Sequence, residues 1–288
     1  MSAPLLFVGA TGNLGAPVAR HMVASGIAVR ALVRDADKAS QDKRLAGVEL
    51  VQGDVRDVAA VQSALSGCTR VYSSLSSDSF DVDESVEVVG LTNLCHAAAR
   101  QDVSWIGYLS GAGDLASETH LRPLAIKARC EQILCDSGIP WTVFKPTHFF
   151  ESLPMFVRDG RIAIPGKQPH TYHYLACDDY AQVVIAVMND AQLHNQALTL
   201  LGPEALTMRQ ALEIYRDALY PGQKVGQLPL WMMRTLGRMT GNADIRRAAE
   251  LFSAFRAQGD EGAASQLPAT VPPINTTCQQ WCQQQAST

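Results

Sequence analysis

A strand that runs directly into a glycine-rich turn near the start of the chain constrains its fold more than any other feature. The four apolar residues 5–8 predict a strand buried on both faces, as strands of parallel sheets are. Gly9, Gly12 and Gly15 follow at intervals of three. The first glycine of such a motif permits a tight turn, and the second lets the backbone approach a diphosphate. The third allows the next helix to pack closely against the strand. We therefore predict a dinucleotide site at the N-terminus of a helix over residues 13–25.

The order of the remaining elements separates this prediction from its alternative, an ordinary glycine-rich turn. Strands and helices alternate through the first half of the chain, which predicts right-handed crossovers within a parallel sheet. After the first strand, predicted strands cover residues 28–33, 48–51, 70–73, 105–109 and 141–144, and the longest predicted helices cover residues 83–100 and 121–136. We expect an α/β protein with a doubly wound parallel sheet, which is the Rossmann type of NAD(P)-binding fold.

The pattern loosens after Pro146. Short strands are predicted at residues 162–164, 172–175 and 197–200, and helices at residues 178–188, 208–219, 230–239 and 245–255. We expect a dinucleotide-binding domain over residues 1–150 and a small, mostly helical C-terminal substrate lobe over residues 151–260, packed on it. Residues 261–288 are rich in Gln, Ala, Ser and Pro, so a loosely ordered tail is predicted there.

Composition and charge narrow the classes of function. Hydrophobic residues make up 47% and charged residues 18%, as in ordinary globular proteins. A net charge of -4 argues against nucleic acid as the main partner. No apolar run reaches the roughly 18 residues of a transmembrane helix, and the early first strand predicts that no signal peptide is present. Seven cysteines without framework spacing predict reduced thiols and a cytoplasmic location.

The end of the second predicted strand indicates which dinucleotide binds. Arg34 stands where an arginine suits the 2′-phosphate of NADP, whereas an acidic residue suits the ribose hydroxyls of NAD. Its planar guanidinium can bind a phosphate through two hydrogen bonds, and Lys38 adds a second positive charge. Asp35 leaves NAD open, because a shift by one residue would bring it to the ribose. A further alternative is that Arg34 and Asp35 are solvated loop charges. We expect NADP(H).

Other strand ends supply further predicted contacts with the dinucleotide. Asp54, after the third strand, is placed to accept a hydrogen bond from the exocyclic amine of adenine. Ser73 and Ser74 end the fourth strand and are expected beside the nicotinamide half. The cofactor-binding residues predicted in this way are Gly9, Thr11, Gly12, Asn13, Leu14, Gly15, Arg34, Lys38, Asp54, Val55, Ser73, Ser74 and Leu75.

These motifs occur in the order seen in atypical short-chain dehydrogenases, and the chain most resembles their NmrA-like group. The motifs are the glycines of residues 9–15, Ala31-Leu-Val-Arg34, Gly53-Asp-Val55, Leu109-Ser-Gly111 and Lys127. Residues 127–146 resemble that group's run of Lys, Glu, Ser-Gly, strand and Pro, and residues 145–153 are similar to the corresponding stretch of divinyl chlorophyllide reductases. The resemblance covers about residues 4–205, and it implies an NAD(P)-binding fold with oxidoreductase chemistry.

The resemblance breaks down at the proton donor. Members of the family carry Tyr four residues before the helical Lys, and Pro123 occupies that position here. The resemblance implies that Lys127 still anchors the nicotinamide ribose or acts alone, and that Pro146 contacts the cofactor. The alternative is that Lys127 is a surface lysine paired with Glu131, four residues further along the same helix.

Two further residues are candidates for the chemistry. Ser110 matches the family's serine after the fifth strand, where it would hydrogen-bond a substrate carbonyl or cap the loop. His148 would act as a general acid, or it packs among Phe149 and Phe150. We therefore predict Lys127, Ser110 and His148 as catalytic residues. We predict no metal site, because no histidine or cysteine group has a third firm ligand.

Residues 230–239 combine apolar bulk with two arginines. We expect a buried helix of the substrate lobe there. The alternative is a helix that faces a lipid-like substrate or a membrane surface.

The leading hypothesis is an NADPH-dependent reductase of a small apolar or quinone-like substrate, which lacks the Tyr of the family's Tyr-x-x-x-Lys pair. The competing hypothesis, favoured by Pro123, is a non-catalytic NADP(H)-binding redox sensor or assembly factor with a protein partner. A structural protein that has lost the cofactor is a third hypothesis, and the intact glycine turn argues against it. A homodimer is compatible with each, and the fold alone does not decide between them.

Overall fold

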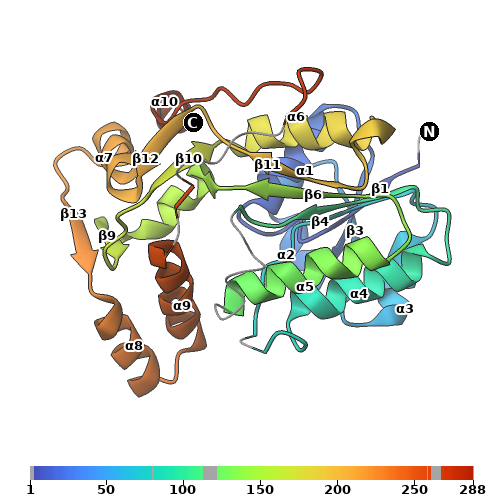
Figure 1. Ribbon diagram of the computed structural model, residues 1–288, viewed down its shortest axis with the longest axis horizontal. Helices are drawn as coiled ribbons and strands as arrows, with labels where there is room; N and C mark the ends of the chain where they lie inside the picture. The colour runs from blue at the N-terminus through green and yellow to red at the C-terminus, as the bar shows by residue number, and fades with distance from the viewer. Residues whose placement is uncertain (1–2, 80, 113–121, 258, 261–266, 288) are drawn as a thin grey trace.

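The computed structural model of this chain describes residues 3–79, 81–112, 122–257, 259–260 and 267–287. Figure 1 shows a sheet with helices on both faces, and a lobe of short strands and helices beside it. Among the described residues the sheet has seven strands in the order β11-β6-β5-β4-β1-β2-β3, and each neighbouring pair is parallel. The predicted α/β class and doubly wound parallel sheet are confirmed.

The centre of the sheet is its first strand. The seven strands are β1 (Leu5–Val8), β2 (Val29–Val33), β3 (Glu49–Gln52), β4 (Arg70–Ser73), β5 (Trp105–Leu109), β6 (Trp141–Pro146) and β11 (Gln196–Leu200). β1 lies between β2 and β4, and all of its residues are buried. The strand order therefore reverses at β1. In open parallel sheets, ligands bind outside the carboxyl ends of the strands at this kind of reversal.

Two layers of helices sandwich the sheet (Figure 1). One layer holds α1 (Gly15–Ala24) and α6 (Cys177–Met188), and the other holds α3 (Val58–Leu65), α4 (Val86–Ala98) and α5 (Arg122–Asp136). The short α2 (Ala36–Ser40) follows β2. Each layer has its own apolar core against the sheet. The central strands are covered on both faces, which explains their continuous apolar sequences.

The last strand of the sheet comes from the second half of the chain. β11 pairs with β6, and α6, which precedes β11, packs against α1. Residues 177–200 thus return to the sheet after the chain has entered the lobe. The two parts of the molecule are interleaved in sequence rather than divided at residue 150.

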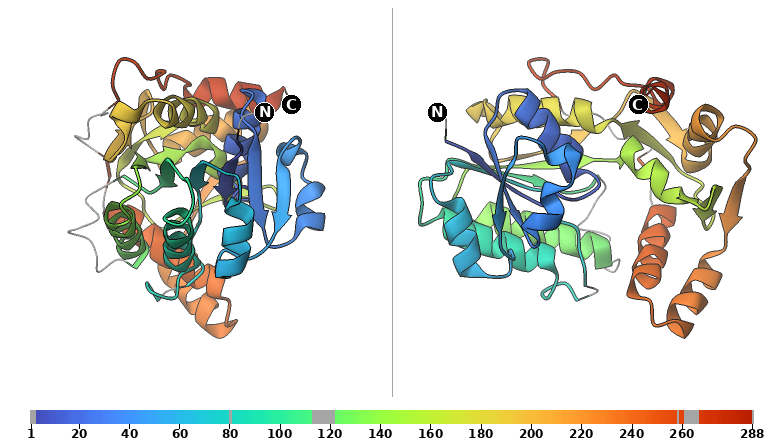
Figure 2. Two further views of the ribbon diagram at one scale, coloured as in Figure 1. Left: turned by 90° about the vertical axis from the view of Figure 1, so that its right-hand side faces the viewer. Right: turned by 180° about the vertical axis from the view of Figure 1, so that it is seen from behind.

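The lobe contains two small sheets and most of the remaining helices. Its strands are β7 (His148–Phe149), β8 (Val157–Arg158), β9 (Arg161–Pro165), β10 (Thr171–Leu175), β12 (Glu204–Thr207) and β13 (Val225–Leu228). Its helices are the 3-10 helix η2 (Phe150–Phe156), α7 (Met208–Leu219), α8 (Leu230–Met239), α9 (Ala243–Ala257) and α10 (Cys278–Ala286). Seen from behind in Figure 2, α8 and α9 extend from the lobe alongside the sheet domain.

The end of the chain differs from the loosely ordered tail that its composition predicts. Helix α10 begins with a capping box between Thr277 and Gln280 and packs against α7. Cys278, Trp281 and Cys282 are buried, and the Trp281 indole donates a hydrogen bond of 3.0 Å to Oε1 of Glu151. Three apolar side chains at helical spacing dock this glutamine-rich helix. Residues 261–266 and 288 of the predicted tail lie outside the described residues.

No helix in the part of the chain that the structure describes is both long enough and apolar enough to cross a membrane.

Candidate functional site

The fold requires two of the three glycines in the turn after β1. Gly9 has a φ of +89°, and a Cβ there would lie 2.4 Å from the carbonyl oxygen of Ser74. A Cβ on Gly15 would lie 2.1 Å from the carbonyl oxygen of Gly9. A Cβ on Gly12 would approach only Gly9 O, at 3.2 Å, and Gly15 N, at 4.0 Å. The contact at position 12 is the mildest of the three, so the glycine there also fits a ligand that lies close to the backbone.

The N-terminus of α1 opens onto the same space. Its N-cap, Leu14, has no side-chain hydrogen bond, so the first turn is not capped by its own sequence. The Asn13 amide instead donates to the carbonyl oxygen of Glu151 in η2, at 2.7 Å. The helix dipole and the backbone N–H groups at such an end suit an anion. The turn thus fits the diphosphate of a dinucleotide.

The end of β2 favours Arg34 over Asp35 as the group that meets a ribose. The Asp35 carboxylate accepts the backbone N–H of Lys38 at 2.8 Å and caps α2, so it is engaged within its own loop. The Arg34 side chain is exposed directly after the strand. Because β2 neighbours β1, this guanidinium follows a strand end next to the glycine turn.

Residues after the other strands make local contacts that the sequence does not reveal. Oδ1 of Asp54 accepts the backbone N–H of Arg56 at 2.9 Å, and Val55 packs where a Cβ on Gly90 would lie. The Ser73 hydroxyl is buried with no hydrogen-bonding partner among the described residues. The predicted contacts of these residues with a cofactor stay predictions.

A pocket of about 1040 Å³ runs from the glycine turn into the lobe. It lies at the carboxyl ends of β1, β4, β5 and β6, where the reversal of strand order predicts a ligand site. The predicted site residues that line it are Gly12, Asn13, Leu14, Gly15, Ser74, Leu75, Ser110, Lys127, Pro146 and His148. Those that do not line it are Gly9, Thr11, Arg34, Lys38, Asp54, Val55 and Ser73.

Lys127 lies in the pocket wall with its ammonium group fixed. Nζ donates to Oε1 of Glu87 and, at 2.9 Å, to the carbonyl oxygen of Leu109. The Tyr108 hydroxyl donates to the same Glu87 oxygen at 2.6 Å, and the Tyr108 ring centroid lies 5.1 Å from Nζ. An ammonium has three hydrogens, so one remains for a ligand in the pocket. The alternative pairing of Lys127 with Glu131 is wrong.

Glu131 instead bonds two residues of neighbouring strands. The Ser110 hydroxyl donates to its Oε1 at 2.5 Å, and Nζ of Lys145 lies 3.4 Å from its Oε2. A hydroxyl has one hydrogen, and that of Ser110 points at Glu131. In this arrangement Ser110 can accept a hydrogen bond from a ligand but cannot donate one to a substrate carbonyl. Its contact supports the interpretation in which Ser110 holds the loop.

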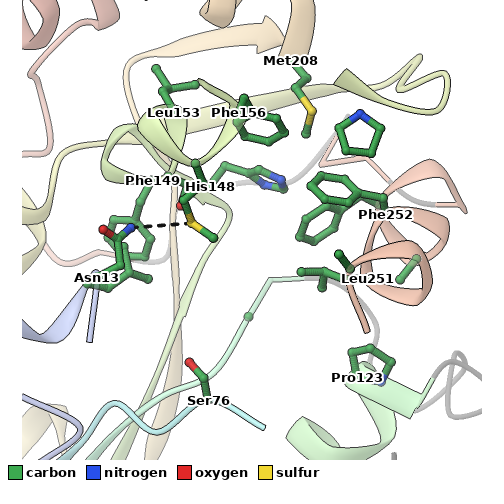
Figure 3. Close-up of a pocket in the computed structure, with 18 of the residues that line it drawn as sticks. Asn13, Ser76, Pro123, His148, Phe149, Leu153, Phe156, Met208, Leu251 and Phe252 are labelled. Carbon is green, nitrogen blue, oxygen red and sulfur yellow. Dashed lines mark hydrogen bonds between the residues drawn. The ribbon is translucent and has the colours of Figure 1, made fainter. Parts of the chain in front are cut away.

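Residue 123, where members of the family carry tyrosine, lines the pocket. Pro123 and Leu124 line it one turn before Lys127 (Figure 3). A tyrosine at residue 123 would place its hydroxyl near the pocket, whereas proline has no proton to give. The departure from the family pattern therefore falls at the site itself.

His148 is enclosed by aromatic rings. Its imidazole stacks on Tyr172 with ring centroids 4.0 Å apart, and the Phe255 centroid lies at 4.6 Å. Neither ring nitrogen has a hydrogen-bonding partner among the described residues. Burial lowers the pKa of His148 to about 4, so the imidazole is neutral at pH 7. A neutral imidazole is a poor general acid but offers one donor and one acceptor to a ligand.

The part of the pocket beyond His148 is apolar, and we call it the apolar chamber. Its walls are Leu153, Phe156, Met208, Leu251 and Phe252 (Figure 3). Figure 3 shows the imidazole of His148 pointing toward Phe252.

Two polar groups that the sequence did not single out also reach the pocket. The Tyr174 hydroxyl and Oδ1 of Asp260 are buried without a partner among the described residues. Oδ2 of Asp260 accepts the backbone N–H of His173 at 2.6 Å. Burial raises the pKa of Tyr174, so this hydroxyl keeps its proton. Alternation along β10 could have indicated that Tyr172 and Tyr174 share one face.

The described residues contain no group of three His, Cys, Asp or Glu side chains arranged to hold a metal ion. His173 pairs with Asp260, whereas Asp178 pairs with Arg20 at 3.3 Å.

Comparisons with known proteins agree with this architecture. NAD(P)H azoreductase from Xenophilus azovorans is 24% identical over 274 residues, which cover 94% of this chain and 92% of the relative. Photosystem II assembly factor Ycf39 from Trieres chinensis is 24% identical over 251 residues, which cover 82% of this chain and 76% of the relative.

Among solved structures, the NADPH-dependent quinone oxidoreductase QOR2 from Escherichia coli, complexed with NADPH, is similar in fold. Its TM-score is 0.72 at 23% identity, and the match covers 98% of this chain and 99% of that one. A model of the NmrA-like family matches residues 1–282. The chain belongs to the NmrA-like family.

Proposed function

We propose that this chain is an NADPH-dependent reductase of a small apolar or quinone-like molecule. One observation carries the proposal: a single pocket joins the open space above Gly12 to the apolar chamber, with Lys127 and His148 between them. A dinucleotide lying along the carboxyl ends of the strands would thus end beside a space of suitable size and polarity for a second molecule.

The cofactor would be held by three groups of this chain. The backbone of the glycine turn and the N-terminus of α1 would bind the diphosphate, and Arg34 would bind the 2′-phosphate. The remaining hydrogen of the Lys127 ammonium would bind a hydroxyl of the nicotinamide ribose. NADPH supplies a hydride when bound, and the chain supplies orientation.

The chamber would select an uncharged, flat substrate. The five side chains that define it are apolar or aromatic, so a charged molecule would lose hydration against them. Neutral His148 can donate one N–H to a carbonyl oxygen of the substrate, and the Tyr174 hydroxyl offers a second donor. A quinone has two carbonyl oxygens and otherwise apolar edges, which suits this pattern.

Lys127 is the candidate for moving the proton that accompanies reduction. Pro123 has no proton to give, and the His148 imidazole is neutral at pH 7. Lys127 lines the pocket, and its one remaining hydrogen serves either the ribose or the substrate, so in this second role Lys127 does not bind the ribose. The relatives named azoreductase and quinone oxidoreductase support a reductase of aromatic or quinonoid molecules.

A second candidate function is a non-catalytic NADP(H)-binding sensor or assembly factor. Pro123 at the pocket and the likeness to a photosystem II assembly factor favour it. In that function the apolar chamber would hold no substrate, and a protein partner would respond to the bound cofactor. The cytoplasmic location and the homodimer stay predictions from the sequence.

Oxidation of NADPH in the presence of quinones, enones and aldehydes separates the two functions. The reductase oxidises NADPH with at least one acceptor of this panel. The variant Ala248→Phe narrows the chamber from α9 without touching the glycine turn, and it should keep NADPH binding while losing turnover. Firm NADPH binding with no oxidation by any acceptor would instead support the sensor.

A further inference from the structure

Helix α8 exposes apolar side chains on the side that should face water. Trp231 is 67% exposed and Met239 is 82% exposed, and Met232 and Leu236 are also exposed. At 100° per residue these four occupy one arc of the helix, with Thr235 among them. The opposite arc carries the buried residues Leu230, Met233 and Gly237, which face the rest of the lobe. The sequence predicts a buried helix here, and the structure shows that only one side of it is buried.

This helix lies at the free tip of the lobe. Figures 1 and 2 both place α9 between α8 and the helices of the sheet domain. α8 packs against α9, so its apolar arc has no covering element among the described residues. Large exposed apolar patches with a polar rim mark sites of interaction with proteins, membranes or ligands.

The charge of the segment that contains α8 and α9 differs from that of the whole chain. Residues 224–257 contain six basic residues, Lys224, Arg234, Arg238, Arg246, Arg247 and Arg256, against two acidic ones, Asp244 and Glu250. Their net charge is thus +4 in a chain whose total is -4. Arg234 and Arg238 lie on α8 at the edge of the apolar arc, by the same helical spacing. A basic edge beside an apolar arc matches an anionic surface.

The apolar arc continues into the pocket. Leu228, Met233 and Leu236 line the pocket, and Leu228 and Leu236 are also exposed at the surface. The pocket wall formed by Leu228 and Leu236 is therefore apolar both at the surface and inside the pocket. A lipophilic molecule could pass from a surface that covers α8 into the pocket without crossing bulk water.

We infer that α8 docks on an anionic lipid surface, with its apolar arc at the level of the headgroups, and that substrate enters the pocket from the membrane. A ten-residue helix offers less area than the roughly 800 Å² per partner of a stable protein interface. Tryptophan and arginine side by side at the edge of an apolar arc suit a water–lipid boundary. The entry of substrate rests on the proposed function, whereas the docking does not.

Sedimentation with vesicles tests the docking. The full chain is mixed with phosphatidylcholine vesicles, with or without phosphatidylglycerol. We expect binding to the anionic vesicles, much weaker binding to the neutral ones, and a blue shift of emission that is absent in Trp231→Phe. The double variant Trp231→Ser/Met239→Ser should weaken partitioning at least about tenfold. The matched control Val58→Ser changes an exposed apolar residue of α3 and should have no effect.

A charge reversal tests the anionic preference. Arg238→Glu should weaken binding to the anionic vesicles by about fivefold or more, whereas Arg100→Glu, after α4, should not. Equal binding to neutral and anionic vesicles would overturn the charge argument. Absence of vesicle binding would overturn the docking. If the wild type forms a dimer that the Trp231→Ser/Met239→Ser variant does not form, the apolar arc binds a second copy of this chain. That result would overturn the docking on lipid.

The activity of the same variants tests the entry route. Trp231→Ser/Met239→Ser should slow reduction of a long-chain quinone embedded in anionic vesicles and leave reduction of a water-soluble quinone unchanged, because neither residue lines the pocket. Equal effects on both quinones would overturn the entry route. If neither quinone is reduced by the wild type, the proposed function fails, while the vesicle sedimentation still decides the docking.

Discussion

The ammonium of Lys127 is held by the carboxylate of Glu87, whose side chain is only 2% exposed. The two residues come from α5 and α4, and Tyr108 of β5 donates to the same carboxylate. This arrangement fixes Lys127 in the wall of the pocket between the glycine turn and the apolar chamber.

Glu87→Gln should therefore affect both stability and site geometry. The amide keeps the shape of the side chain but leaves the Lys127 ammonium without a counter-charge in a largely buried position. We expect a loss of about 2–3 kcal/mol in the free energy of unfolding, measured by denaturant titration. Asp57→Asn, at the exposed N-terminus of α3, is the control and should cost less. Equal effects of the two changes would show that the buried pair contributes nothing.

Arg34→Ala should remove the preference for NADPH over NADH. Charge-assisted hydrogen bonds to the 2′-phosphate contribute roughly 1.5–3 kcal/mol, or about ten- to a hundredfold in affinity. Calorimetric titration of both proteins with both cofactors measures the preference, and Arg44→Ala serves as the control because Arg44 pairs with Asp42. A wild type that binds NADH and NADPH equally would rule out the role of Arg34.

Gly12→Val and Gly15→Val should fail in different ways. A Cβ at residue 12 would lie 3.2 Å from the carbonyl oxygen of Gly9, a much milder contact than at residue 15, so the variant should fold, as judged by circular dichroism, but should lose NADPH binding. A side chain at residue 15 would collide with the carbonyl of Gly9, so that variant should be destabilised even without cofactor. Normal NADPH binding by folded Gly12→Val would mean that the phosphates bind elsewhere.

His148 should make the protein less stable in mild acid. Its pKa is about 4 in the folded chain because of burial, against 6.5 when exposed, so only the unfolded chain takes up a proton between these values. Stability is therefore lost as the pH falls from about 6.5 toward 4, by an amount on the order of 3 kcal/mol.

The variant His148→Phe isolates this contribution. It keeps a ring among Tyr172 and Phe255 but cannot titrate, so its advantage in melting temperature over the wild type should grow as the pH is lowered. A difference in melting temperature between the two proteins that stays constant from pH 7 into the acid range would contradict a buried, neutral His148.

Much of the sheet domain is predictable from the sequence because its signals are local. The apolar run before Gly9 and the glycine spacing predict β1, the turn and α1 within two residues. The pairing of β11 with β6 was not predictable, because a five-residue strand carries no signal for its partner. Helix α10 was missed because three buried side chains are outnumbered by glutamines.

The sequence predicts those site residues whose place follows from the order of the strands. It does not predict the contacts that form only when separate helices and strands pack together. Strand ends placed Ser74 and Ser110 at one edge of the sheet, since parallel strands end together, and the family resemblance placed Lys127 there. The alternative pairing of Lys127 with Glu131 rested on closeness in sequence, whereas its actual partner Glu87 approaches only when α4 and α5 pack. The low pKa of His148 follows from rings of β10 and α9, which no local pattern around residue 148 contains.

The central claim is that a hydride acceptor reacts in this pocket under the control of Lys127. The most direct test mixes the NADPH complex of the wild type, and of Lys127→Ala, with an excess of quinone and follows the absorbance of bound NADPH. We expect full oxidation in the wild type and a rate about a hundredfold lower in Lys127→Ala, because a displacement of about 1 Å costs that much. The affinity for NADPH should change far less, since the phosphates provide its main contacts. Bound NADPH that stays reduced in the wild type, or equal rates in the two proteins, would contradict the account.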